Sequence, residues 1–374
     1  VHGLTLDWKR FVTYQTVDFM KMERDAVKEV NPDIPVTANL MGFYDGLDYF
    51  KFGPELDVVS WDNYPQWHTT DNVEIAVSSA MTHDVMRSIK HENFLLMEST
   101  PSMTNWMPIS MLKRPGMHLL SSMQAVAHGS DSVQYFQFRK SRGSCEKFHG
   151  AVVDHVSHGG VFDSVKNENT RVYKDVQSVG AQLKIMNERG DVYGTEVKPQ
   201  VAIVYDVENR WALDAAAGPR NKDKDEKYVE TLLTHYRPFW DKGVQVDIVD
   251  MDGDISKYKL VIAPMLYMYR AGFEKKMRAF VENGGTLVTT YWSGIVDDTD
   301  LCKMGGFPGD MMDVFGVWNE EIDSLPDGMK NSIAFNGARY DAMELCARIH
   351  PLTAEVLGTY ENCLLYTSPS PRDM

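Results

Sequence analysis

Apolar runs of strand length recur along the first part of the chain, and each gives way to polar or aromatic residues. The runs cover residues 36–41, 57–62, 93–98 and 132–139. Stretches with apolar residues at helical spacing separate or flank them, at residues 8–30, 73–89 and 112–127. This alternation of strands and helices predicts an α/β fold with a parallel sheet and helices outside it.

The run at residues 93–98 delivers one carboxylate, Glu98, to its C-terminal end. In a parallel α/β barrel the side chains at the carboxyl ends of the strands converge on one open face. The neighbouring runs present Asn39 and Tyr64 in the same way, and the loops beyond Glu98 carry further polar and aromatic residues. We therefore expect these side chains to gather around Glu98.

Four strands are half of what a (β/α)₈ barrel needs, and half a barrel would expose two unpaired edges. The missing strands belong either to upstream sequence or to a different, open architecture. The chain opens on Val1-His2-Gly3, with neither an initiator Met nor a signal-peptide pattern, which favours upstream sequence.

A second region begins near residue 198. The helix before it has an apolar stripe that we expect to pack in a core, formed by Val172, Val176, Val179, Leu183 and Met186. Beyond it, strand-like runs lie at residues 201–205, 244–249, 260–263 and 286–290, with helices at 228–242 and 272–283. This order predicts a smaller doubly wound domain.

The remaining sequence has weaker patterns. After residue 316 we predict only one more strand, at residues 354–360. Residues 363–374 fit nothing before them and resemble translated adapter sequence, so we expect a non-native tail. The predicted domains are residues 1–197 and 198–362.

Composition and charge exclude several classes of function. Lys plus Arg number 38 and Asp plus Glu 53, a net charge of −15, which disfavours nucleic acid and anionic membranes as partners. The four cysteines form no CxxC pair, so neither a disulfide framework nor a zinc cluster is indicated. No apolar run is long enough to span a bilayer.

Carboxylates beside aromatic rings, with few cations, suit a sugar ligand. Aromatic rings pack on the apolar face of a pyranose, while acids bind its hydroxyls and stabilise an oxocarbenium-like transition state. The alternative to sugar binding for Tyr64, Trp106 and His149 is that they only pack within their loops.

Several short segments, in order, resemble the β-galactosidases of glycoside hydrolase family 42 over roughly residues 1–360. The segments are Asp-Trp-Lys-Arg-Phe at 7–11, Ser-Trp-Asp-Asn-Tyr-Pro at 60–65, Leu-Met-Glu-Ser at 96–99 with Asn-Trp at 105–106, and Ser-Arg-Gly at 141–143 with Glu-Lys-Phe-His at 146–149. The resemblance implies a (β/α)₈ barrel, of which this chain holds strands five to eight, then a flavodoxin-like trimerisation domain. It also implies a cytoplasmic homotrimer for the full-length protein, and no cofactor or metal in this region.

The resemblance also implies roles for individual residues. Glu98 matches the nucleophile of a retaining mechanism, which works with a second carboxyl about 5 Å away as acid and then base. Tyr64 matches a tyrosine beside the nucleophile, and Trp106 a sugar-stacking tryptophan. Glu146 and His149 match residues that hydrogen-bond galactose hydroxyls.

One family feature is missing. The acid/base glutamate of the family follows an asparagine at the end of strand four, and the Asn-Glu pair at Asn319-Glu320 lies in the second domain, where it cannot be that residue. We therefore expect a truncated chain that does not turn over a β-galactoside efficiently, because losing one of two coupled carboxyl groups removes most of the rate.

Two other functions were weighed. The chain could be a non-catalytic sugar-binding or oligomerisation module. The layout of the second domain is also similar to class I glutamine amidotransferases, but no Gly-x-Cys-x-Gly occurs in residues 201–290, and Cys302 has no local His-x-Glu. We expect an interaction surface there rather than an amidotransferase.

Overall fold

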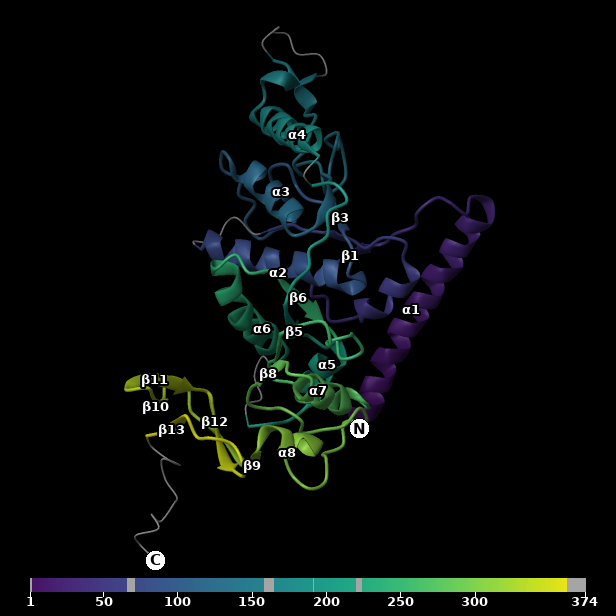
Figure 1. Cartoon of the computed structure of the whole chain (residues 1–374). Helices are drawn as coiled ribbons and strands as arrows, with labels where there is room; N and C mark the ends of the chain where they lie inside the picture. Colours follow the sequence, from purple (N-terminus) through teal and green to yellow (C-terminus); the bar gives the residue numbers. More distant parts are fainter. Residues whose placement is uncertain (1, 66–70, 158–164, 191, 220–223, 362–374) are drawn as a thin grey trace, which may run out of the picture. The chain divides into compact units, whose positions relative to one another are not determined.

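The computed structural model describes residues 2–65, 71–157, 165–190, 192–219 and 224–361 (Figure 1). The chain forms two compact units. The N-terminal unit comprises Arg10–Val201 and Leu233–Val249, and the C-terminal unit comprises Val1–Lys9, Ala202–Leu232 and Asp250–Met374. Among the described helices, none is both long enough and apolar enough to cross a membrane.

The N-terminal unit contains a four-stranded parallel sheet, which confirms the predicted α/β order. Its strands lie side by side in chain order as β1 (Asn39–Leu40), β2 (Ser60–Asp62), β3 (Phe94–Glu98) and β4 (Ser130–Val133). The long helices are α1 (His2–Val30), α2 (Asn72–Lys90), α3 (Met117–Ala127) and α4 (Arg171–Arg189). A sixth strand of the chain, β6 (Val246–Val249), contacts α2 in the same unit.

The first, second and last of the predicted strands are shorter than expected. Before β1, side chains add to the pairing of the backbone: Asp57 accepts from the Val36 amide at 2.7 Å, and the Thr37 hydroxyl donates to the Val58 carbonyl at 2.6 Å. In the last, β4 ends at Val133, six residues before the predicted end.

The residues after β4 pair instead with the segment that follows the 141–149 loop. The Gln137 amide donates to the Gly150 carbonyl at 3.1 Å, and the Val152 amide donates back to Gln137 at 3.0 Å. This pairing folds the loop that carries Glu146 and His149 back toward the sheet.

Helix ends follow local capping chemistry. Asp71 accepts hydrogen bonds from the Val73 and Glu74 amides at the start of α2, and Thr170 caps α4 in the same way through the Tyr173 amide. The predicted stripe on α4 packs at its centre, where Val179 is buried, while its other four members are half-buried.

Short 3₁₀ turns connect these elements. They are η1 (Tyr49–Lys51), η2 (Gly53–Glu55), η3 (His155–Ser157), η4 (Asn167–Asn169) and, in the C-terminal unit, η5 (Gly309–Met311).

The C-terminal unit contains three of the four predicted strands of the second region, and the fourth is β6 of the N-terminal unit. β5 (Val201–Val204), β7 (Leu260–Ala263) and β8 (Thr286–Thr289) lie in one sheet, and β7 and β8 are parallel. The helices are α5 (Val207–Ala215), which the sequence pattern missed, α6 (Lys224–Asp241), whose last residues belong to the N-terminal unit, and α7 (Phe273–Glu282). Gly284, at φ +91°, lies just past the end of α7, as the Asn-Gly-Gly break predicts.

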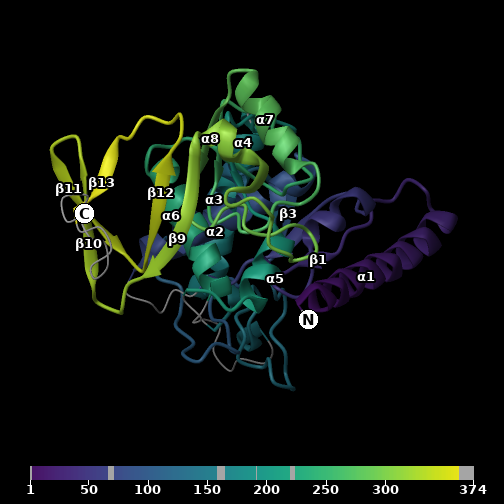
Figure 2. The ribbon, with the colours of Figure 1, turned by 90° about the horizontal axis from the view of Figure 1, so that it is seen from below.

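The prediction of a single strand after residue 316 was wrong. After α8 (Met312–Phe315), the structure has β9 (Val317–Ser324), β10 (Lys330–Phe335), β11 (Ala338–Met343), β12 (Leu345–Pro351) and β13 (Gly358–Tyr360) (Figure 2). β12 and β9 form an antiparallel pair, and β11, β10 and β13 form a second antiparallel sheet.

These strands were missed because few of their side chains are fully buried and most of those in β11 are exposed, which weakens the alternation of apolar and polar positions. One signal was nevertheless present. Asn336 and Gly337 both have positive φ, 49° and 74°, between β10 and β11, and Asn-Gly is the preferred sequence of a two-residue hairpin turn. The predicted tail, residues 363–374, lies outside the described residues.

Candidate active site

Glu98 is the last residue of β3, where the neighbouring strands also end. In the parallel register, Asp62 of β2 lies opposite Glu98. Asn39 of β1 joins the two carboxylates, because its side-chain amide donates to Asp62 Oδ1 at 3.0 Å and to Glu98 Oε1 at 3.3 Å. Three adjacent strands thus each contribute one polar side chain to a single cluster.

Tyr64 holds the other oxygen of Glu98. Its hydroxyl donates to Oε2 at 2.8 Å, so each carboxylate oxygen has a donor. The backbone explains why Tyr64 comes so close: the Asn63 amide donates to the Glu98 carbonyl at 2.9 Å, which keeps the chain beside β3 after β2 has ended. Burial, followed by the Glu98 carboxylate, raises the pKa of Tyr64 well above its ordinary value, so the phenol remains a donor.

Aromatic rings form one side of this cluster. The Tyr64 ring meets Trp106 edge to face, with centroids 5.4 Å apart, and meets His149 at 5.9 Å. Phe136 packs edge to face against His149 at 5.1 Å. Trp106 is 55% exposed, so part of its ring surface is available to a ligand.

A hydrogen-bonded loop fixes the orientation of His149. Its Nδ1 lies 2.8 Å from the Asn105 side-chain oxygen, and the amide nitrogen of Asn105 donates to the Cys145 carbonyl at 2.8 Å. Because that oxygen only accepts, Nδ1 carries the proton. Burial lowers the pKa of His149, and its Nε2 has no hydrogen-bond partner within the described part of the chain.

Glu146 lies in the same loop and is half-buried. Its carbonyl accepts from the His149 amide at 2.9 Å. Its negative charge opposes the effect of burial on the His149 pKa, and adds to the rise in the Tyr64 pKa. Glu146 therefore acts electrostatically on the same two rings.

The cluster contains residues to which the sequence gave no role. Burial, and then the negative charge of Glu98, raise the pKa of Asp62 to about 6, while the hydrogen bond from Asn39 opposes the rise. Asp62 ends its strand two positions before Tyr64, so its place in the pattern was a usable signal. Asn105 was noted only as the neighbour of Trp106, and its link to His149 depends on the tertiary fold.

The structure separates other candidate groups from this cluster. Among the described residues, no group of three or more His, Cys, Asp or Glu side chains is arranged to hold a metal ion. Glu320 lies on β9, where its carboxylate accepts from Arg348 at 3.0 Å and from His350 at 2.5 Å. Those partners give Glu320 a structural role within its own antiparallel pair.

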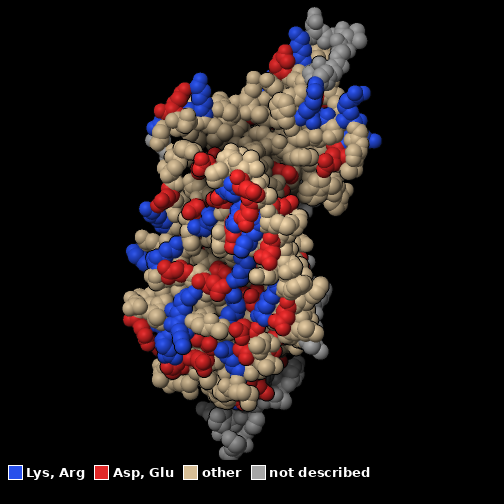
Figure 3. All heavy atoms as spheres, turned by 90° about the vertical axis from the view of Figure 1, so that its right-hand side faces the viewer, with Lys and Arg blue, Asp and Glu red and all other residues tan. Residues whose placement is uncertain are grey.

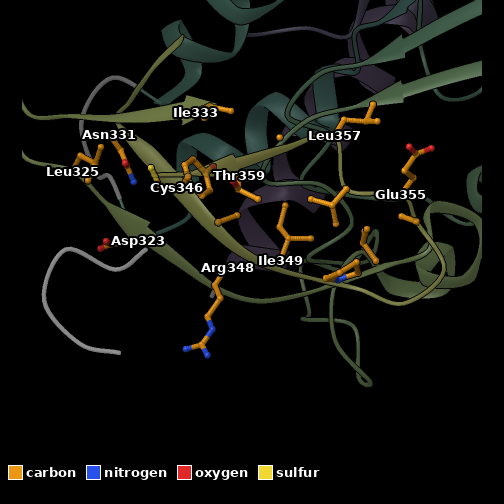
Figure 4. Close-up of a pocket in the computed structure, with 17 residues that line it drawn as sticks. Asp323, Leu325, Asn331, Ile333, Cys346, Arg348, Ile349, Glu355, Leu357 and Thr359 are labelled. Atoms are coloured by element: carbon orange, nitrogen blue, oxygen red, sulfur yellow. The ribbon is translucent and has the colours of Figure 1, made fainter. Parts of the chain in front are cut away.

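A cavity of about 710 Å³ lies in the C-terminal unit (Figure 4). Its lining comes from β9, β10, β12, β13 and residues 354–357, and includes Leu325, Ile333, Ile349 and Leu357. The lining is mainly apolar, which does not suit a hydroxyl-rich sugar.

On the face of the molecule in Figure 3, acidic and basic side chains are interspersed rather than gathered by sign.

Comparison with known proteins decides the family. Residues 1–186 match the family model described as β-galactosidase, and residues 199–370 match that described as β-galactosidase trimerisation domain. The chain is similar to Gan42B, a GH42 β-galactosidase from G. stearothermophilus, with 46% identity and a TM-score of 0.91. This chain belongs to glycoside hydrolase family 42.

Other relatives agree with this family 42 assignment. β-Galactosidase Pbg of Clostridium perfringens is 54% identical over 375 residues, which cover 96% of this chain and 52% of that protein. The crystal structure of a β-galactosidase from Rahnella sp. R3 has a TM-score of 0.91 and 50% identity, covering 98% of this chain and 53% of that one. The match to Gan42B covers 99% of this chain and 53% of that protein. The family 42 chain described here thus spans about half the length of these relatives.

Proposed function

We propose that this chain is part of a retaining β-galactosidase that releases terminal β-D-galactose from β-galactosides by double displacement, with Glu98 as the nucleophile. The observation that carries the proposal is the placement of Glu98: it ends a parallel strand, and Tyr64 and Asn39 each hold one of its oxygens. The names of its family 42 relatives supply the substrate class.

In the first step, a Glu98 oxygen attacks the anomeric carbon of galactose as the glycosidic bond breaks. The leaving oxygen takes a proton from an acid, and a covalent galactosyl ester remains on Glu98. Water then attacks the anomeric carbon, loses a proton to the same group, and releases galactose and the free carboxylate. Tyr64 and Asn39 keep the carboxylate correctly oriented.

The sugar would lie against the aromatic side of the cluster. The exposed ring surface of Trp106 suits the apolar face of galactose, and Glu146 and His149 offer acceptors for its hydroxyls. The His149 ring is buried and held in one orientation by Asn105.

We further propose that residues 1–197 are the C-terminal half of a (β/α)₈ barrel, with β1 to β4 as strands five to eight. Residues 198–362 would form a flavodoxin-like domain that supports a homotrimer in the full-length protein. The parallel order of β1 to β4 and the description of the second family model support this division. The acid/base would then lie outside these 374 residues, and the isolated chain would turn over substrate poorly.

A mechanism-based label tests the nucleophile without needing the acid. 2,4-Dinitrophenyl 2-deoxy-2-fluoro-β-D-galactoside carries a leaving group that departs unprotonated, so attack by Glu98 forms a stable galactosyl ester. Mass spectrometry of the intact chain and its peptides should show one label on Glu98, absent from Glu98→Gln. The control Glu92→Gln removes an exposed carboxylate just before β3 and should label normally. Absence of the label, or its appearance on another carboxylate, would refute the proposal.

The alternative of a non-catalytic sugar-binding module makes a different prediction. Calorimetry with galactose on Glu98→Gln would show binding in both cases. Only the enzyme proposal predicts that the fluoro-sugar label is lost in that variant.

A further inference from the structure

We propose that Asn39 and Asp62 are positioning residues for Glu98, in which one side-chain amide holds two carboxylates and fixes the rotation of the candidate nucleophile. The inference rests on the proposed function for its catalytic meaning. It adds two residues that the sequence pattern left without a role.

The geometry of three neighbouring strands carries the argument. Asp62 and Glu98 are register partners on β2 and β3, and Asn39 reaches both of them from β1. A side-chain amide has two N–H groups. One can therefore point at Asp62 Oδ1, at 3.0 Å, while the other points at Glu98 Oε1, at 3.3 Å.

As a result, both oxygens of the Glu98 carboxylate accept a hydrogen bond. Tyr64 donates to Oε2 and Asn39 donates to Oε1, so rotation of the carboxylate plane would break one of these hydrogen bonds. A nucleophile held in one orientation attacks from a fixed direction, and small misplacements of reacting groups are costly. Asp62 in turn keeps the Asn39 amide aimed at Glu98.

The charges give this arrangement a dependence on pH. Four of the described residues face Asp62. They are Asn39 on β1, Glu98 on β3, Tyr64 in the continuation of β2, and Tyr49 in η1. Burial and the Glu98 charge raise the pKa of Asp62 to about 6. As pH rises through 6, Asp62 becomes an anion, binds the Asn39 amide more strongly and places a second negative charge near the anomeric carbon. Attack by Glu98 should therefore become faster across this range.

A carboxyl titration tests the pair in the chain as it exists. In protein labelled with ¹³C at the aspartate carboxyl carbons, Asp62→Asn identifies the Asp62 resonance. We expect this resonance to titrate near pH 6, and its midpoint to move upward in Asn39→Ala, which removes the donor. A normal aspartate midpoint for Asp62, or a midpoint unchanged in Asn39→Ala, would overturn the inference.

The chain offers a matched control at the other end of β3. The Asn93 side-chain amide donates to Asp131 at 2.9 Å, which is an asparagine–aspartate pair of the same chemistry away from Glu98. Asn93→Ala should leave the Asp62 midpoint unchanged. Circular dichroism and thermal unfolding of each variant would show that the fold is retained.

Labelling kinetics with the dinitrophenyl fluoro-galactoside then test the effect on the nucleophile. We expect Asn39→Ala to label roughly 10- to 100-fold more slowly than the unmodified chain, and Asn93→Ala to label at the same rate. Asp62→Asn should lose the rise in labelling rate near pH 6. Normal kinetics in both Asn39→Ala and Asp62→Asn would reject the positioning role while leaving the proposed function intact.

The carboxyl titration and the labelling experiment distinguish failure of this inference from failure of the proposed function. If the unmodified chain is not labelled on Glu98 but the titration shows the linked midpoints, the proposed function fails and the coupling of the carboxylates through Asn39 stands. If Asp62→Asn abolishes hydrolysis of galactosides with poor leaving groups but labels normally, Asp62 acts as an acid rather than as a positioning residue.

Discussion

The Tyr64 hydroxyl lies 2.8 Å from Oε2 of Glu98 and donates a hydrogen bond to it. A hydrogen bond to a carboxylate is charge-assisted, so it holds this oxygen of Glu98 firmly in place. The ring carrying this hydroxyl also packs against Trp106 and His149. Tyr64 thus connects the candidate nucleophile to the aromatic side of the site.

Tyr64→Phe removes only the hydroxyl and keeps the ring packing. We expect labelling of Glu98 by the dinitrophenyl fluoro-galactoside to slow by roughly tenfold or more, because a hydrogen bond to a charged group contributes about 1.5–3 kcal/mol. Tyr14→Phe, on α1 with a side chain that is 63% exposed, should label at the unmodified rate. Equal rates for Tyr64→Phe and the unmodified chain would show that the hydroxyl does not assist Glu98.

Strand ends were the most predictable part of this molecule. Apolar runs fixed the identity and order of β1 to β4, and the side chains that follow them gather because parallel strands end at one edge. Glu98, Tyr64, Trp106 and His149 were placed together on this basis. The role of Asp62 depends on a contact between strands, because Asn39 joins it to Glu98 only in the folded sheet.

Features that depend on tertiary contacts were less predictable. The partly buried strands β9 to β12 carry little alternation, so only the Asn336-Gly337 turn marked them. The buried ionic cluster around Asp84 joins α2 to residues about 150 positions away, and no local pattern reports such a contact.

Asp84 holds together the α2 side of the N-terminal unit. Its carboxylate accepts from Arg87, from His128 at 2.8 Å and from the Tyr236 hydroxyl at 2.6 Å. Arg87 also donates to the Val246 carbonyl at 2.6 Å, and its side chain is buried. The cluster therefore anchors α6 and β6 to α2 within this unit.

Asp84→Asn should destabilise the protein by about 3 kcal/mol, because a buried guanidinium would lose a charged partner. The midpoint of urea unfolding, followed by circular dichroism, measures this loss. Glu188→Gln breaks an exposed ion pair with Lys184 on α4 and should change stability by less than about 0.5 kcal/mol. A similar midpoint for both variants would mean that the Asp84 cluster contributes little.

His118 makes stability depend on acidity. It is buried against Tyr135, with ring centroids 4.5 Å apart, and burial lowers its pKa to about 3. Between that value and the ordinary pKa of 6.5, the unfolded chain binds a proton that the folded chain excludes. Stability therefore falls as pH decreases below 6.5.

His118→Phe keeps a ring against Tyr135 and removes the titration. We expect the loss of stability between pH 7 and pH 5 to shrink by about 2 kcal/mol, at about 1.4 kcal/mol per pH unit below 6.5. Urea unfolding at the two pH values measures the difference. His155→Phe, at an exposed position, should leave the slope unchanged, and an equal slope in His118→Phe would exclude His118 as its source.

Lys113 gives a dependence of the same sign at higher pH. Its ammonium is buried and donates to the Thr100 carbonyl at 2.6 Å, two residues past Glu98. Burial lowers its pKa from 10.5 to about 7. Between these values the unfolded chain holds a proton that the folded chain has released, so stability rises with pH across this window. Below pH 7 Lys113 is protonated in both the folded and the unfolded chain, and burial of its charge then lowers the stability of the folded state by the full amount.

Lys113→Met removes the charge along with the hydrogen bond to Thr100, so its effect at a single pH mixes two opposing changes. The informative quantity is how the stability difference from the unmodified chain varies with pH. From pH 6 to pH 9 the unmodified chain should gain about 3 kcal/mol relative to Lys113→Met, because about two pH units of the window are crossed. Lys184→Met, at an exposed position on α4, should follow the unmodified chain throughout. Parallel pH curves for Lys113→Met and the unmodified chain would mean that Lys113 keeps an ordinary proton affinity in the fold.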